Sequence, residues 1–258
     1  ETFYPGRIDL GIGRAPGSDH LTISALAHPK PPVDARYFPQ QLVDLIGYLS
    51  NTLADGHPFG QLKAQPGMPP EHIPDVWLLG SSDYSAQLAA VLGLPFAFAD
   101  FFGHTADHGP MVADIYRSQF KPSGYIDEPH LMVALQVVGA DTPDHAEFVA
   151  SSRRVSRLFS MQGLNPEGGM IPPEQASVFQ PNDMERQMMA QSTKGFMAGT
   201  VEDVRAGIQE ASIRYGTEEI AIVSNCFYFQ DRLRSYELIS RAMGIGISNE
   251  EFSKDIPQ

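Results

Sequence analysis

Residues 76–99 read VWLLGSSDYSAQLAAVLGLPFAFA and hold one complete strand–helix–strand unit. The apolar run 76–79 is typical of a parallel strand that is buried on both faces. A helix rich in small residues is expected over 85–92, with Gly93 ending it. A second apolar run at 96–99 then predicts the next strand. Because two parallel strands need a crossover of this kind, the stretch predicts an α/β fold built on a parallel sheet.

The alternation of strand and helix continues on both sides of this unit. Upstream, residues 8–13 (IDLGIG) predict a strand, and the apolar positions of residues 38–53 lie on one helical face. Downstream, the pattern predicts strands at 131–138 and 220–224 and helices at 110–120, 143–159, 201–215 and 231–243. This order fits either an open doubly wound sheet or a closed eight-stranded barrel. The strands are too few to close a barrel, so we expect a TIM barrel whose first three βα units, about 90 residues, would precede Glu1.

One domain is expected over residues 1–244, followed by a loose tail at 245–258. Within that domain, residues 163–182 are rich in proline and glycine and show no periodicity. Such a long irregular segment is uncommon inside a compact domain unless it is functional or disordered. We therefore predict that residues 163–182 form a mobile flap.

Charge and composition exclude several classes of function. The formal net charge of −13 repels nucleic acids and anionic lipid surfaces, so neither is an expected partner. The most apolar stretch, 86–102, contains Gln87, Gly93 and Asp100, which argues against a membrane-spanning helix. Cys226 is the only cysteine, which excludes an intramolecular disulfide and predicts a reducing, cytoplasmic location.

Two strand ends carry residues suited to binding an anion. Arg14 follows the first strand, and its planar guanidinium can bind a phosphate through two hydrogen bonds. A serine-rich turn follows the 76–79 strand at a helix start, where amide N–H groups and the helix dipole attract anions. Since ligands bind at the carboxyl ends of parallel strands, we predict one phosphate pocket. Its candidate residues are Gly13, Arg14, Gly80, Ser81, Ser82 and Ser85. Taken singly, each feature also fits a purely structural role, in which the serines cap the helix and Arg14 pairs with a surface acid.

Other candidate chemistry is weaker. His104 and His108, with neighbouring acids, could bind a metal on a barrel rim. Their surroundings are rich in glycine and indicate a loop, and no second ligand cluster follows another strand, so no metal site is expected. Tyr84 stands where the second glycine of a serine-hydrolase nucleophile elbow would be, so serine hydrolysis is not expected either. No catalytic residue is identified.

Several of these motifs resemble those of the bacterial-luciferase-like flavin monooxygenases. They are residues 3–17 (FYPGRIDLGIGRAPG), 77–82 (WLLGSS), 199–205 (GTVEDVR) and 232–238 (RLRSYEL). The resemblance covers the chain apart from the flap and the tail. It implies a TIM barrel that binds reduced FMN and uses it to activate oxygen and oxidise a small organic substrate.

The resemblance also implies roles for single residues. Arg14 occupies the position of the family's phosphate-binding arginine, and Ser81, Ser82 and Ser85 fall around the same phosphate. Gly13 would lie near the flavin ring, with Phe98 and Asp100 beside the ring or the substrate cavity. The flap would act as a lid over the site.

The family further implies a homodimer and reduced flavin supplied by a separate reductase. The family's first three strands, including the segment that supplies an active-site histidine, have no counterpart before Glu1. The hypotheses are thus an FMN-dependent monooxygenase, an F420-dependent hydride-transfer enzyme, and a non-catalytic flavin-binding or partner subunit. A metal-dependent barrel hydrolase using His104 and His108 is the remaining alternative.

Overall fold

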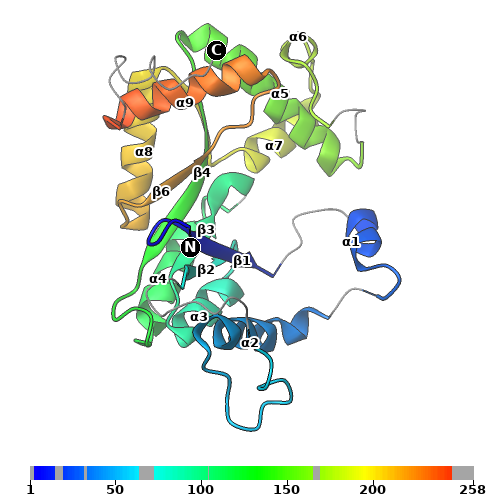
Figure 1. The fold of residues 1–258 in the computed structure, drawn as a ribbon. Coiled ribbons are helices and arrows are strands. Elements are labelled where there is room, and N and C mark those ends of the chain that lie inside the picture. The colour runs from blue at the N-terminus through cyan, green and yellow to red at the C-terminus, as the bar shows by residue number, and fades with distance from the viewer. Residues whose placement is uncertain are drawn as a thin grey trace. The chain divides into compact units, whose positions relative to one another are not determined.

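The computed structural model describes residues 3–14, 20–31, 34–63, 73–103, 105–164 and 169–245. The chain divides into two compact units, residues 1–98 with 112–131 and residues 99–111 with 132–258. Both units consist of parallel strands connected by helices (Figure 1). The parallel α/β class predicted from the sequence is therefore confirmed. The single domain predicted over residues 1–244 stays a prediction.

The first unit holds the parallel strands β1 (Asp9–Gly13), β2 (Asp75–Gly80) and β3 (Phe96–Ala99), with β2 in the middle. Its register pairs Gly13 with Leu79, so β1 and β2 end side by side. The helices of this unit include α1 (His20–Ala27), the short η1 (Ala35–Tyr37), α2 (Phe38–Ser50), α3 (Asp83–Leu92) and the later part of α4 (Gly109–Gln119).

Small side chains and one tyrosine hold the first unit together. Ala86, Ala89 and Ala90 are fully buried, which lets α3 pack closely on β2. Gly93 ends α3 with a φ of 63°, a backbone conformation that favours glycine. The hydroxyl of Tyr116 donates to the carbonyl oxygens of Leu94 (2.9 Å) and His130 (3.1 Å). Burial raises the pKa of Tyr116 to about 12, so this donor stays protonated at neutral pH.

In the second unit β4 (Leu131–Gly139) lies between β5 (Phe196–Gly199) and β6 (Ile220–Val223), and all run parallel. Its other elements are η3 (Asp100–Phe102), α5 (Pro143–Met161), α6 (Pro173–Ala176), α7 (Asp183–Ser192), α8 (Val201–Tyr215) and α9 (Phe229–Met243). Helices α8 and α9 pack on each other, and α6 and α7 pack on α5 (Figure 1).

The predicted flap contains more regular structure than expected. Helix α6 lies within it, and Ser152 and Ser156 of α5 hydrogen-bond to the backbone of Ile171. Residues 169–182 are thus held against α5, whereas residues 165–168 lie outside the described part. Movement of this segment as a lid stays a prediction, and the predicted tail beyond Ile245 also lies outside the described residues.

No helix in the described ranges is long and apolar enough to cross a lipid bilayer.

Helix α8 begins with a capping box. The Asp203 carboxylate accepts hydrogen bonds from the backbone N–H of Thr200 (2.9 Å) and from its hydroxyl (2.8 Å). The Thr200 side chain in turn accepts from the Asp203 N–H. These bonds, the backbone one first, hold the pKa of Asp203 below its usual value, because they favour the charged carboxylate. Asp203 and Thr200 belong to the GTVEDVR motif, so the motif has a structural role at the helix start.

Asp203→Asn is expected to destabilise the protein at neutral pH and to have a smaller effect in acid. A carboxylate whose pKa is lowered on folding stabilises the fold above its unfolded-state pKa, and this stabilisation is lost as the pH falls through the folded value. The check is the urea midpoint of both proteins at pH 7 and pH 3. Glu202→Gln, in the same first turn, is the matched control. An equal loss at both pH values for Asp203→Asn would contradict the assignment.

Candidate functional site

The carboxyl ends of β1 and β2 meet at one edge of the first unit. The register aligns the last residue of β1, Gly13, with Leu79, and Arg14 follows directly. On the neighbouring strand, Gly80 is followed by Ser81 and Ser82 and then by the first turn of α3. The order of strands thus places the two predicted strand ends beside each other, as the site hypothesis requires.

Arg14 reaches the first turn of α3. Its guanidinium carbon lies 4.5 Å from the ring centroid of Tyr84, the second residue of α3. Within the described ranges Arg14 forms no ion pair, so the alternative in which it pairs with a surface acid finds no support there. A guanidinium that lies over an aromatic ring uses its face for this contact, which leaves its N–H groups available to a ligand acceptor.

The serines of the predicted set lie at the start of α3. Ser82 is the N-cap residue of α3, but its side chain makes no capping hydrogen bond. Its Oγ lies 3.5 Å from the Oγ of Ser85, which is buried. Because the first N–H groups of a helix have no intrahelical acceptor, a helix start without a side-chain cap is suited to an anion. Serine hydroxyls beside it can donate to the same ligand.

The two glycines of the predicted set differ in importance. A Cβ at residue 80 would overlap the Oγ and Cβ of Ser85, so only glycine lets Ser85 approach the end of β2. A Cβ at residue 13 would meet Leu79 at 3.5 Å, an ordinary contact. Gly80 is therefore required by the packing of the site, whereas a role for Gly13 near a flavin ring stays a prediction.

Asp100 belongs to a buried polar network, and its expected place beside the flavin ring or the substrate cavity stays a prediction. It is fully buried in the second unit, and its carboxylate accepts from the hydroxyls of Thr105 (3.0 Å) and Tyr215 (2.7 Å). Arg214 lies 3.6 Å away as an ion-pair partner. Burial, followed by the bond to Asp100, raises the pKa of Tyr215, which keeps its hydroxyl protonated and donating. Asp100 thus joins η3 to α8 within the second unit.

Sequence reasoning did not identify Thr105, Arg214 and Tyr215 as partners of Asp100. The available signal was a carboxylate directly after an apolar strand, which indicates either a ligand contact or a buried polar network. Phe98, the other residue expected beside a cavity, is also fully buried.

The structure adds nothing in favour of a metal centre. His104 lies outside the described residues, and His108 precedes α4. Within the part of the chain that the structure describes, no group of three or more His, Cys, Asp or Glu residues could hold a metal ion.

Comparisons with known proteins identify the family. Residues 1–219 match the model of the luciferase-like monooxygenase family. A luciferase-like monooxygenase of Escherichia coli K12 is 38% identical over 239 residues, which cover 92% of this chain and 68% of the relative. The solved structure of apo-MsnO8 is 30% identical with a TM-score of 0.79, covering 96% of this chain and 71% of that chain.

Two more distant structures share the fold. One is the oxygenating constituent of 3,6-diketocamphane monooxygenase of Pseudomonas putida, solved in complex with FMN. It is 17% identical with a TM-score of 0.58, and the match covers 92% of this chain and 70% of that chain. The other is the F420-dependent tetrahydromethanopterin reductase of Methanopyrus kandleri, at 14% identity and a TM-score of 0.54. This match covers 92% of this chain and 73% of that chain. These structural relatives are luciferase-like TIM-barrel enzymes, which confirms the predicted fold class. The chain belongs to the luciferase-like monooxygenase family.

Proposed function

We propose that this protein is an FMN-dependent monooxygenase that uses reduced flavin and oxygen to oxidise a small organic substrate. The observation that carries the proposal is the corner formed by Arg14, Tyr84 and the uncapped start of α3. Membership of the luciferase-like monooxygenase family supports an oxidoreductase. FMN in the diketocamphane monooxygenase structure supports this cofactor.

The donor set of the corner fits a phosphate monoester. Arg14 supplies a fixed positive charge with a planar fork of N–H groups, which matches phosphate oxygens. The start of α3 adds backbone N–H donors at the positive end of the helix dipole. Ser81 and Ser82 are partly buried and add hydroxyl donors at the same edge. Every one of these groups donates hydrogen bonds, as a dianion with only acceptor oxygens requires.

Each residue then has a defined part in binding. Arg14 binds the phosphate, and the Tyr84 ring positions the guanidinium above the first turn of α3. Ser82 and Ser85 donate to the remaining phosphate oxygens, and Gly80 leaves the space that Ser85 needs. When bound, reduced flavin supplies the electrons that activate oxygen. The proposal also includes a homodimer, a separate reductase that supplies the reduced flavin, and a cytoplasmic location.

A second candidate is an F420-dependent hydride-transfer enzyme. It is favoured by the structural likeness to an F420-dependent reductase. F420 also carries a phosphate group, so the same corner would serve it. Titration of the protein with each cofactor separates the two, because the better cofactor binds at lower concentration.

Arg14→Ala is expected to weaken FMN binding about 10- to 100-fold, since charge-assisted hydrogen bonds contribute roughly 1.5–3 kcal/mol. Riboflavin has the same ring system without the phosphate, so its affinity should not change. The measurement is flavin fluorescence during titration with protein, for FMN and riboflavin in parallel. The expected result is that the preference for FMN over riboflavin disappears in the variant.

Arg7→Ala is the matched control for this experiment. Arg7 is exposed, and its guanidinium carbon lies 5.7 Å from the ring centroid of Tyr4, but it precedes β1 rather than following it. Its removal should leave both flavin affinities unchanged. The phosphate site is wrong if the wild-type protein binds riboflavin as tightly as FMN, or if Arg7→Ala and Arg14→Ala behave alike.

A further inference from the structure

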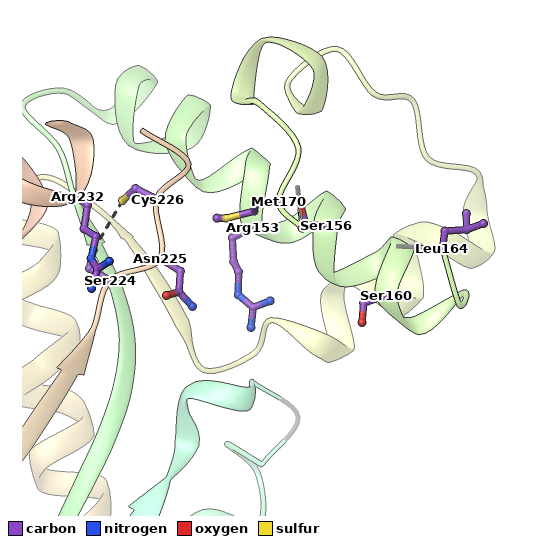
Figure 2. Close-up of a pocket in the computed structure, with 10 residues that line it drawn as sticks. Arg153, Ser156, Ser160, Leu164, Met170, Ser224, Asn225, Cys226 and Arg232 are labelled. Carbon is purple, nitrogen blue, oxygen red and sulfur yellow. Dashed lines mark hydrogen bonds between the residues drawn. The ribbon is translucent and has the colours of Figure 1, made fainter. Parts of the chain in front are cut away.

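The second unit contains a cavity of about 310 Å³ at the carboxyl end of β6. It is lined from α5, from the segment 224–226 that follows β6, and from α9 (Figure 2). Arg153 and Asn225 point into it from α5 and from this segment. Ligands of parallel α/β folds bind at this end of the strands, and the volume is at the small end of the range for ligand pockets.

Among the described residues, the lining of this cavity includes two arginines and no acidic residue. Arg153 and Arg232 both line it, and neither forms an ion pair within the described ranges. No acidic residue lines it in the described part, and Asp231, the neighbour of Arg232, is hydrogen-bonded to His145. Arg157, one turn further along α5, does not line the cavity but is close enough to Arg153 to act on its charge. Burial first, and the charge of Arg157 second, lower the pKa of Arg153.

Unpaired hydrogen-bond donors lie around Arg153. Its Nε donates to the Oε1 of Gln136 at 3.1 Å, which fixes the side chain. The Nε2 of Gln136 and the Nε of Arg157 are buried, and neither has a hydrogen-bond partner among the described residues. Buried polar groups are normally paired, but these two donors lie outside the cavity lining, so the contact with a ligand rests on Arg153 itself.

The cavity also has an apolar side and neutral donors. Met170 and Leu164 line it together with Ser156 and Asn225. The Ser156 Oγ accepts from the backbone N–H of Ile171 at 3.0 Å, which leaves its own O–H to donate. A ligand that matches both sides has an anionic end and an apolar end.

We propose that this cavity binds a small organic acid, with its carboxylate against Arg153 and its apolar part against Met170, while Arg232 adds positive charge to the same lining. Ser156 and Asn225 donate further hydrogen bonds to the carboxylate. This inference goes beyond flavin binding, because every residue that carries it belongs to the second unit and none belongs to the corner at Arg14. Its test therefore needs no flavin.

Cys226 offers a direct readout because it lines the cavity and is the only cysteine in the sequence. The probe is hexanoate, with uncharged hexanamide as its matched control, and the reagent is N-ethylmaleimide. Burial raises the pKa of the Cys226 thiol, so alkylation is followed at pH 8.5 by intact-protein mass spectrometry. At saturation hexanoate should slow alkylation at least fivefold, whereas hexanamide and inorganic phosphate at equal ionic strength should not.

Variants assign this protection to the arginines. Arg153→Gln should abolish protection by hexanoate, and Arg232→Gln should reduce it to a smaller extent. Arg154→Gln is the control, because Arg154 is the next residue of α5 but pairs with Glu147 and lies over the ring of Phe196. The proposal is overturned if hexanamide protects as well as hexanoate, or if phosphate alone gives full protection. It is also overturned if both arginine variants keep the protection of the wild-type protein.

Discussion

Asp100→Ala is expected to lower the free energy of unfolding by about 2–5 kcal/mol, because two hydroxyl donors lose their buried acceptor. The substitution removes the acceptor for the hydroxyls of Thr105 and Tyr215 and the partner of Arg214. The Tyr215 hydroxyl is then left inside the protein without this acceptor, and a buried unpaired donor is costly. Urea unfolding followed by circular dichroism measures the loss.

Two variants show whether burial causes this loss. Tyr215→Phe removes one hydrogen bond but keeps the ion pair, so it should cost less, about 1–3 kcal/mol. Asp107→Ala removes a carboxylate of the same loop that forms an exposed ion pair with Lys194, and its cost should stay below about 1 kcal/mol. Equal effects of Asp100→Ala and Asp107→Ala would refute the role given to the buried carboxylate.

Gly103→Ala is expected to destabilise the protein by about 2–5 kcal/mol, because two costs add. The residue has a φ of 85°, which costs any L side chain about 1–2 kcal/mol. A Cβ there would also overlap the backbone carbonyl oxygen of Ser192, which cannot rotate away as a side chain could. The same urea assay measures the change.

Gly56→Ala separates the two costs. Gly56 has a φ of 80°, and a Cβ built there meets nothing within 4 Å. It should therefore show only the cost of the backbone conformation, about 1–2 kcal/mol. If both alanine variants lose the same stability, the close approach of Gly103 to Ser192 has no energetic effect.

Periodicity predicted the long elements well. The strand at 96–99 and the helix at 201–215 have the predicted bounds, because burial on a sheet enforces a clear apolar pattern. Helix α7 was missed because few of its residues are buried, and Met184 is largely exposed. Its signal was the capping box of Asn182 and Glu185 rather than an apolar stripe.

The site was predictable only in part. Chain order and parallel pairing place Arg14 near the start of α3, and the structure agrees. The position of Tyr84 under the guanidinium depends on side-chain rotamers, which no pattern in the sequence specifies. The buried network of Asp100 was not predicted because its partner Tyr215 lies 115 residues further along the chain. Contacts at that separation arise from the tertiary fold.

The stack of Arg14 on Tyr84 has a thermodynamic consequence for ligand capture. An arginine side chain carries about 2 kcal/mol of rotamer entropy, much of which is lost when a ligand immobilises it. The aromatic ring already restricts the guanidinium in the free protein, so part of this entropy is lost during folding. The anion affinity that we propose for the corner would then depend on a preorganised side chain rather than on one that the ligand has to order.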